Sequence, residues 1–437
     1  MSFPRIFAVV LLATSFAAHA DNPTTSRTLA NGLKVIVQED HRAPVVMTQL
    51  WYKVGSSDEV AGKTGLSHAL EHMMFKGTKT VPAGEYVKRI SALGGSNNAY
   101  TTTEETVYHV TIAAQHLPKV LELEADRMAN LNFSDTVFNN EMKVIREERR
   151  QRIDDNPDSM LYAELLNTAW TKSPNRTSVI GKMADLHKLK PNDLRQWYRR
   201  WYAPNNAVLV VVGDVQPENV FAQVEQYFGS LKERKLADHQ DISEPETHEK
   251  SSFATLKGNT KQPMMMLAYR VPHLQKMDEK LPYALDMLTN VLDGHSAARL
   301  SQRLVRGSQV AQNIGTGYSL LARQSQMWII SVSPTNGVDL AQLKAVLKKE
   351  IADVAHNGVS EAELNRAKTI QRTNKIYSYD EISARANLMG TLESVGLKYD
   401  DENAIRQRLD EVTTADIQAA TKLLTQEREV YVELLPK

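Results

Sequence analysis

The sequence HALEH, residues 68–72, lies inside TGLSHALEHMMFKGT, residues 64–78, and carries one histidine on either side of a glutamate. On an α-helix, positions i, i+3 and i+4 share one face, so His68, Glu71 and His72 are expected to point toward one spot. Two imidazoles one turn apart can clamp a zinc ion, and the carboxylate between them can take a proton from the attacking water. The alternative is an amphipathic helix whose histidines make ordinary hydrogen bonds. The inverted metallopeptidase spacing H-x-x-E-H favours the metal site.

A catalytic zinc needs a third protein ligand, and EMKVIREERRQR, residues 141–152, is the candidate segment. On a helix, one stripe of this segment holds Glu141, Val144, Ile145 and Glu148. Two acids on an apolar stripe are costly unless they meet a cation or another partner. We therefore predict Glu148 as the third ligand and Glu141 as a carboxylate behind the ligands. The remaining charges, Glu147 and residues 149–152, fit an ordinary solvated helix face.

The overall composition narrows the class of protein. The chain has 437 residues, 42% of them hydrophobic, so two or more domains with sizeable cores are expected. Its 52 basic and 52 acidic residues balance, which argues against binding to nucleic acid or to an anionic membrane through bulk charge. The absence of cysteine excludes thiolate chemistry and thiolate zinc ligands.

The first twenty residues have the pattern of an export signal. A short basic start is followed by IFAVVLLATSFAA, residues 6–18, and then by the small-x-small sequence Ala18-His19-Ala20. The apolar run is too short to span a bilayer comfortably, which disfavours a retained anchor. We predict cleavage near Ala20 and a periplasmic or secreted protein, with no membrane span after cleavage.

The remaining chain divides into two halves with a similar order of elements. Strand-like runs at residues 33–38, 45–54, 97–103, 107–112 and 207–214 are interspersed with helical patterns at 81–93, 117–132, 138–153 and 220–227. A charged stretch with few large apolar residues follows, and the pattern then restarts with strands near 264–271, 327–332 and 430–435. We predict a catalytic domain at 21–235, a linker at 236–252 and a homologous, metal-free domain at 253–437. The fold class expected is α+β, with a mixed sheet flanked by helices in each domain.

Several motifs together resemble one peptidase family. These are HALEH with the following MMFKGT, the acid pair Glu141 and Glu148, GGSNNAYT at 94–101 with TVY at 106–108, and WYAPNNAVLVVVGD at 201–214. The sequence is similar to the pitrilysin-like zinc peptidases, which include the zinc-bearing β subunit of the mitochondrial processing peptidase and bacterial periplasmic homologues. The resemblance covers nearly the whole chain after the export signal, and its motifs are most specific in the first half.

The resemblance implies a fold and a set of roles. Each subunit would consist of two homologous α/β-roll domains and form half of a clam-shell chamber. His68, His72 and Glu148 would hold one zinc ion per chain, Glu71 would be the general base, and Glu141 would assist. Asn98, Ala99 and Tyr100 would lie on an edge strand to which a substrate peptide adds as a further strand, although an ordinary strand after a turn is the alternative for that segment.

The second half departs from the family pattern at one place. Family members that act alone or as homodimers carry an arginine and, seven residues later, a tyrosine that reach the zinc site. In the corresponding stretch, ARLSQRLVRGSQVAQ at 298–312, Val305 and Gln312 take those positions. Arg306 and Tyr318 lie nearby in the sequence at a different spacing. We therefore expect a heterodimer in which a homologous partner without H-x-x-E-H supplies the arginine and the tyrosine.

Two functions follow as hypotheses from these patterns. The first is a zinc metalloendopeptidase subunit that hydrolyses unfolded peptides or oligopeptides in the periplasm. The second is a structural or peptide-binding subunit with a vestigial metal site. The first is favoured because ligands, base and assisting acid are all present, whereas a vestigial site is expected to have lost at least one of them.

Overall fold

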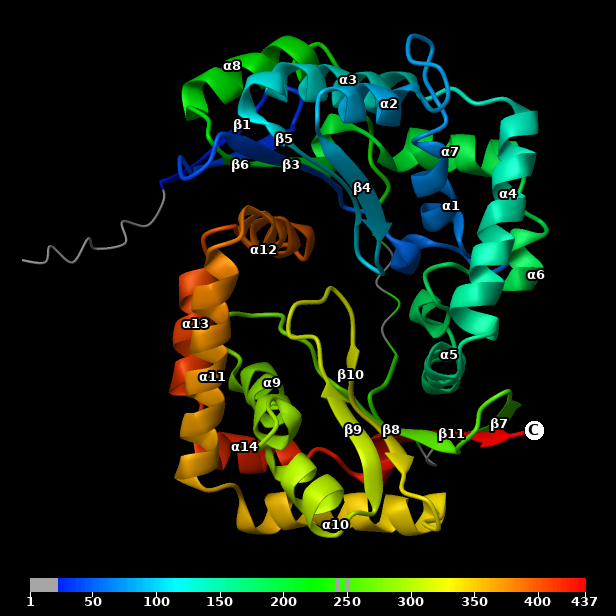
Figure 1. Ribbon diagram of the computed structural model, residues 1–437, viewed down its shortest axis with the longest axis vertical. Coiled ribbons are helices and arrows are strands. Elements are labelled where there is room, and N and C mark those ends of the chain that lie inside the picture. Colours follow the sequence, from blue (N-terminus) through cyan, green and yellow to red (C-terminus); the bar gives the residue numbers. More distant parts are fainter. Residues whose placement is uncertain (1–22, 240–241, 243, 249–251) are drawn as a thin grey trace, which may run out of the picture.

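The structure is a computed structural model that describes residues 23–239, 242, 244–248 and 252–437. The predicted export signal at 1–20 lies outside the described residues, as do parts of the predicted linker at 236–252. The described chain contains two β-sheets, each flanked by helices (Figure 1). This arrangement confirms the fold class expected from the sequence.

The first sheet is built from the first half of the chain. Its strands are β1 (Thr24–Thr28), β2 (Lys34–Glu39), β3 (Val45–Tyr52), β4 (Ser96–Thr101), β5 (Thr106–Ala113) and β6 (Ala207–Gly213), and their spatial order is β1-β2-β6-β3-β5-β4. All pairs are antiparallel except β2 with β6. Strand β6 is buried along its whole length because it lies inside the sheet with both faces covered, which explains its continuous run of valine and leucine. Strand β4 is at the sheet's edge.

The second sheet repeats this topology. Its strands are β7 (Ser252–Gly258), β8 (Met264–Val271), β9 (Ala311–Gly317), β10 (Gln326–Pro334) and β11 (Glu429–Pro436), in the order β7-β11-β8-β10-β9. As in the first sheet, the last strand of the half is inserted between two earlier strands and is parallel to one of them. By this correspondence, β9 at one edge is the equivalent of β4.

Helices occupy the connections in both halves. The first half has α1 (Leu66–Met73), α2 (Glu85–Ala92), α3 (Leu117–Asn130), α4 (Asp135–Arg149), α5 (Pro157–Ala169), α6 (Met183–Leu186), α7 (Pro191–Trp201) and α8 (Pro217–Phe228). The second half has α9 (Lys280–Asp293), α10 (Leu340–Asn357), α11 (Glu361–Tyr379), α12 (Ile382–Ser394), α13 (Glu402–Glu411) and α14 (Thr414–Thr421). Within the described residues, each helix is too short or too polar to cross a bilayer.

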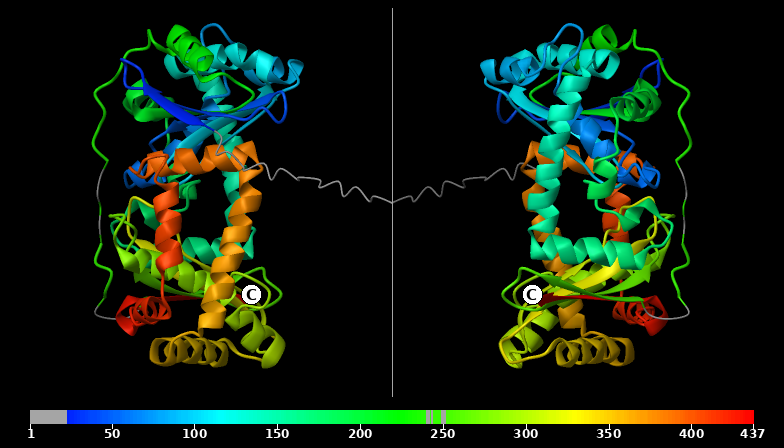
Figure 2. Two further views of the ribbon diagram at one scale, coloured as in Figure 1. Left: turned by 90° about the vertical axis from the view of Figure 1, so that its left-hand side faces the viewer. Right: turned by 90° about the vertical axis from the view of Figure 1, so that its right-hand side faces the viewer.

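The two halves exchange one helix each. Helix α5 of the first half packs on the second sheet, where Leu161 and Leu165 share a core with Met266 and Val432. Helix α12 of the second half packs on the first sheet, where Ala386 and Met389 join Trp51 and its neighbours. Figure 2 shows both contacts from the two sides of the molecule. Each sheet therefore buries one face against a helix from the other half, which fixes the two halves relative to each other.

Local sequence patterns predicted most element types and missed several boundaries. The helix expected at 81–93 begins only at Glu85, after Gly84 at φ 81°. The helix expected at 138–153 begins earlier, at Asp135 behind the capping residue Ser134, and its last turn continues as a π-helix over Arg150–Asp154. Strands β7 and β9 were not predicted. Strand β9 is polar and has no alternation in burial, whereas β7 does alternate, but its largest apolar side chain, Phe253, is on the exposed face and obscures the pattern.

Candidate metal centre

Helix α1 carries HALEH and presents two different faces. Its apolar side chains, Leu66, Ala69, Leu70 and Met73, are buried in the first core. His68, Glu71 and His72 lie on the opposite face, as the helical period requires. Gly65, the residue before the helix, lies in the left-handed region at φ 88°. Both Gly65 N and Ser67 N donate to the buried carboxylate of Glu59, each at 2.7 Å, which satisfies two of the free amides at this helix end. Nothing in the local pattern pointed to Glu59.

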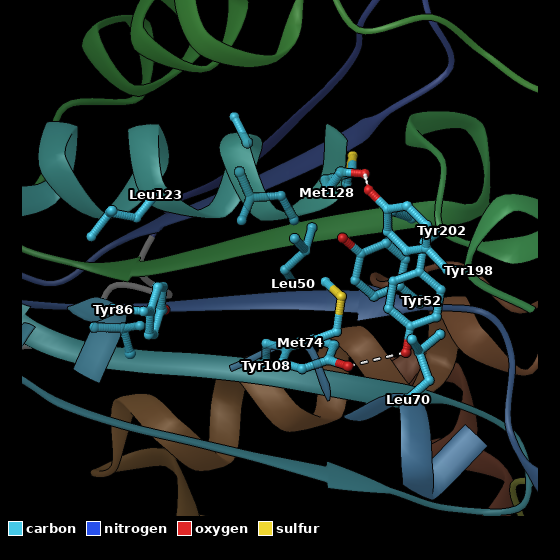
Figure 3. Packing of buried hydrophobic residues seen from close by; sticks show 14 of the residues in the cluster. Leu50, Tyr52, Leu70, Met74, Tyr86, Tyr108, Leu123, Met128, Tyr198 and Tyr202 are labelled. Carbon is cyan, nitrogen blue, oxygen red and sulfur yellow. Dashed lines mark hydrogen bonds between the residues drawn. The ribbon is translucent and has the colours of Figure 1, made fainter. Parts of the chain in front are cut away.

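A cluster of buried tyrosines packs against the apolar side of α1. Leu70 and Met74 pack among Tyr52, Tyr108 and Tyr202, all of which are buried (Figure 3). The rings of Tyr52 and Tyr202 stack with centroids 4.1 Å apart, and the hydroxyls of Tyr108 and Tyr202 are hydrogen-bonded at 3.0 Å. Close aromatic packing of this kind restricts the movement of the helix that packs against it. The orientation of the histidines is thereby tied to the core of the first half.

Helix α4 places the predicted acids beside α1, and the two helices are neighbours in Figure 1. Glu141 and Ile145 are buried, and Glu148 is half-buried. Val144 is 53% exposed, so its predicted place on the buried stripe is wrong. The reason is angular, because position i+3 lies at the margin of a stripe centred between i, i+4 and i+7. Glu147 is exposed and pairs with Arg150, as predicted.

Three potential ligands converge where α1 meets α4. Ligand atoms of His68, His72 and Glu148 all lie within 4.8 Å of one another. Oε2 of Glu148 is 3.7 Å from Nε2 of His68 and 3.2 Å from Nε2 of His72. Donors about 2 Å from one tetrahedral zinc ion are separated by about 3.3 Å, so these spacings match a zinc site. Oε2 of Glu148 is also buried without a hydrogen-bond donor, which is the environment expected of an atom that takes a cation. The donor set, two imidazoles and one carboxylate, fits zinc.

Glu141 lies behind this cluster. Its Oε1 is 2.9 Å from Nδ1 of His72, the ring nitrogen that faces away from Glu148, and its Oε2 is 2.6 Å from Nζ of Lys76. A carboxylate on the far nitrogen of a metal-binding histidine fixes the ring and its tautomer. The structure therefore brings Glu141 to the position behind the ligands that the helical stripe suggested.

Glu71 lies on the same helix face and is held from strand β4. The hydroxyl of Thr101 donates to Oε2 of Glu71 at 2.5 Å. Burial raises the pKa of the Glu71 carboxyl above its ordinary value. A carboxylate with a raised pKa takes up and returns a proton more readily near neutral pH. Thr101 was not singled out from the sequence, because the contact joins residues that only the fold brings together.

The two histidines differ in their electrostatic environment. Burial, followed by the neighbouring His72, lowers the pKa of His68 to about 4, so this imidazole is neutral and can offer a lone pair. For His72, burial acts to lower the pKa, but the carboxylates of Glu141 and Glu148 outweigh it and raise the value to about 9. The pocket around His72 therefore favours a positive charge, which either a proton or a divalent cation can supply.

The three substrate-strand candidates lie on β4, next to Thr101. Asn98 is exposed, Ala99 packs against the core below α1, and the ring of Tyr100 meets Trp51 edge-on at 6.2 Å on the other face of the sheet. Strand β4 pairs only with β5 along the described chain. Its outer edge thus offers backbone groups beside the helix that carries Glu71.

One group of charges on α4 was assigned too simply. The side chain of Arg149 is only 13% exposed, and its Nε donates to the carbonyl of Gly181 at 2.8 Å. Gly181 packs directly on Gly65, the residue before α1. Arg149 therefore connects α4 to the start of α1, and the prediction of a purely solvated face was wrong for this residue. Arg152, which is largely exposed, contacts Oε1 of Glu148 at 3.1 Å.

Of the four candidate residues in the second half, two are exposed and two contact other parts of the same half. Val305 packs against the second core, and Gln312 is exposed on β9. Arg306 is exposed at the end of a π-helix spanning Ser301–Gly307. The hydroxyl of Tyr318 donates to the carbonyl of Pro272 at 2.8 Å, so it is engaged within its own half.

Comparison with known proteins identifies the family of this chain. Residues 34–182 match the family model described as insulinase, peptidase family M16, and residues 188–371 match the model described as the peptidase M16 inactive domain. The chain belongs to peptidase family M16. The candidate zinc ligands all lie within the segment that matches the insulinase model, and the M16 assignment confirms the family resemblance of the sequence.

Individual M16 relatives extend the similarity over almost the whole chain. The zinc protease PqqE of Helicobacter pylori is 30% identical over 387 residues, covering 87% of this chain and 86% of that protein. The uncharacterized zinc protease YmxG of Bacillus subtilis is 25% identical, covering 91% and 94%. Among solved structures, a protease from H. pylori superposes with a TM-score of 0.89 at 28% identity, covering 95% of this chain and 100% of that one.

Proposed function

We propose that this chain is a zinc-dependent endopeptidase subunit that cleaves unfolded peptides. The observation that carries the proposal is the convergence of His68, His72 and Glu148, with ligand atoms within 4.8 Å of one another and Glu71 on the same helix face. The relatives named as zinc proteases support the same chemistry. One zinc ion per chain is proposed, because among the described residues a single cluster has the necessary donors.

His68, His72 and Glu148 would hold the ion, which when bound supplies Lewis-acid polarisation of the scissile carbonyl. Oε2 of Glu71 is occupied by the Thr101 hydroxyl, so Oε1 is the atom available to the attacking water. Glu71 takes the proton of that water and returns it to the leaving amine. Glu141 keeps His72 in the orientation that leaves its Nε2 facing Glu148.

The peptide is proposed to bind along the outer edge of β4, at Asn98, Ala99 and Tyr100. Backbone hydrogen bonds at a sheet edge are independent of sequence, and they require an extended chain. Folded proteins rarely offer such a segment, so unfolded peptides are the substrate class that this edge fits. The position of Thr101 at the end of β4 would set the peptide next to Glu71.

The active unit is proposed to be a heterodimer in which two subunits form a clam-shell chamber. Val305 packs against the second core, and Gln312 is exposed on the edge strand β9. The hydroxyl of Tyr318 is hydrogen-bonded within its own half. A homologous partner without H-x-x-E-H would add the arginine and tyrosine that stabilise developing charge. We also propose that the chain divides into domains at 21–235 and 253–437. The proposed periplasmic location rests on the leader sequence at 1–20.

The test is peptide hydrolysis by the chain without its leader, alone and mixed with a homologous subunit from the same host, with and without a chelator. The proposal expects chelator-sensitive endoproteolysis that rises strongly in the mixture. Full activity of the chain alone would eliminate the heterodimer. Zinc binding without hydrolysis in every mixture would favour the alternative of a peptide-binding subunit.

A further inference from the structure

The two equivalent hairpins of the halves meet at their tips. The loop between β9 and β10 reaches the turn between β4 and β5 (Figure 1). The contact is made by Arg323, whose side chain is 16% exposed. Its Nε donates to the Glu104 carboxylate, and its Nη2 donates to the Glu104 carbonyl at 2.9 Å. A guanidinium that binds both the side chain and the backbone of one residue holds the turn in a defined position.

The same guanidinium binds a second segment of the first half. Nη2 of Arg323 lies 3.2 Å from both Oγ of Ser57 and Oδ2 of Asp58, in the short helix just before α1. Nδ1 of His239, in the connection between the halves, lies 2.6 Å from Nη1 of Arg323 and 2.6 Å from Oδ1 of Asp58. One residue of the second half thus connects two separate segments of the first half.

These two segments are packed directly on each other. The amides of Ser56 and Ser57 donate to the carbonyls of Thr102 and Thr103 at 3.1 and 2.9 Å. The approach is so close that a Cβ on Gly55 would lie 2.5 Å from the Thr103 backbone. A displacement of the turn is therefore transmitted to residues 55–58.

Both segments are adjacent in the chain to residues that hold Glu71 or its helix, Thr101 and Glu59. The turn at 102–105 directly follows Thr101, whose hydroxyl binds Glu71. The segment at 56–58 directly precedes Glu59, whose carboxylate caps the start of α1, the helix that carries Glu71. Arg323 is connected to Glu71 by both routes, one through the side chain of the base and one through its helix.

From this geometry we infer that Arg323 is a positioning residue for Glu71, by which the second half controls the orientation of the general base. The inference rests on the proposed function, since it takes Glu71 as the base. It assigns a role in the reaction to the metal-free half of the same chain, in addition to closing the molecule. The contact between the hairpin tips sets the alignment of Thr101 against Glu71. His68 and His72 share α1 with Glu71, whereas Glu148 lies on α4, outside this network.

The test compares Arg323→Gln with Lys34→Gln in the assembled enzyme. Lys34 also joins the halves, through a 2.5 Å ion pair with Glu393 on α12, and its hydrogen bond and ion pair are with that residue rather than with the turn or with residues 55–58. We expect Arg323→Gln to lower kcat about ten- to hundredfold through misalignment of the base, with KM and zinc content close to wild type and partial recovery in Arg323→Lys. Lys34→Gln should leave kcat within about twofold. Equal losses in both variants, or a loss explained by zinc release, would overturn the inference.

A second measurement keeps this test separate from the proposed function. Hydrogen exchange of Arg323→Gln should rise at residues 55–58 and 101–105 and stay unchanged in β2 and β6. If the wild type lacks zinc-dependent hydrolysis, the proposed function fails whatever the exchange data show. If hydrolysis is present and exchange in these segments does not change, the positioning role fails while the function stands.

Discussion

Nδ1 of His72 lies 2.9 Å from Oε1 of Glu141, on a different helix, and this contact orients Nε2 of the same ring toward Glu148. The pairing fixes the orientation of the imidazole. Replacement of Glu141 by Gln should weaken zinc binding by about 10- to 100-fold, since the hydrogen bond loses its charge. The zinc Kd can be measured by competition with a chromophoric chelator.

The control for this variant is Glu147→Gln on the same helix, which removes the same charge from an exposed side chain paired with Arg150. Its zinc Kd should equal that of the wild type. Equal weakening in both variants would show that helix charge, rather than the His72 contact, determines the affinity.

Glu71→Gln should abolish most hydrolysis and leave zinc binding intact. Glutamine keeps the shape of the side chain and can still accept from Thr101, but it cannot take a proton, so kcat should fall by about 10²- to 10⁴-fold. Zinc content, measured by atomic absorption, should remain one per chain because Glu71 is outside the ligand set. Unchanged cleavage would remove Glu71 from the role of base.

Glu244 is expected to make the fold sensitive to acid. Burial acts to raise its pKa, but donors from Thr171, Lys172 and Ser173 at 2.5 to 2.9 Å outweigh it and lower the pKa to about 2 from an ordinary 4.5. A lowered folded-state pKa stabilises the protein above pH 4.5, and this stabilisation is lost as the pH falls toward 2.

Glu244→Gln should therefore reduce the free energy of unfolding by roughly 2 kcal/mol at pH 7, with the difference from wild type closing as the pH falls toward 2. Urea denaturation at pH 7 and pH 3 measures the two gaps. A gap of the same size at both pH values would show that the carboxylate charge has no part in the stabilisation.

Gly390 on α12 marks the contact between that helix and the first sheet. A Cβ at this position would lie 1.9 Å from the indole of the buried Trp51. Alanine favours a helix over glycine by about 1 kcal/mol, but overpacking costs about 1–3 kcal/mol, so Gly390→Ala should destabilise the protein on balance. Gly315→Ala, where a Cβ would have open space, is the control, and thermal denaturation compares the two. A stabilised Gly390→Ala would mean that α12 can shift away from Trp51 at little cost.

The short-range features of the site could be predicted because they depend on helical geometry alone. The spacing of HALEH places His68, Glu71 and His72 on one face in any helix, and the stripe on α4 separates Glu141 and Glu148 from Glu147. Strands such as β3, β6 and β8 were evident from their own apolar runs. The edge strands β7 and β9 were not, since an edge strand is stabilised by its neighbour rather than by its own pattern.

The family, the two-part organisation and the shared face of His68, Glu71 and His72 could therefore be inferred from the sequence alone. Each depends on residues close together in the chain or on motifs of fixed spacing. The folded structure was needed to show that Glu148 faces both imidazoles, that Thr101 binds Glu71 and that Arg323 joins the two hairpin tips. These contacts join residues from 30 to 219 positions apart in the chain. They follow from how α1, α4 and the two sheets pack, and packing is a property of the whole core that no local period encodes.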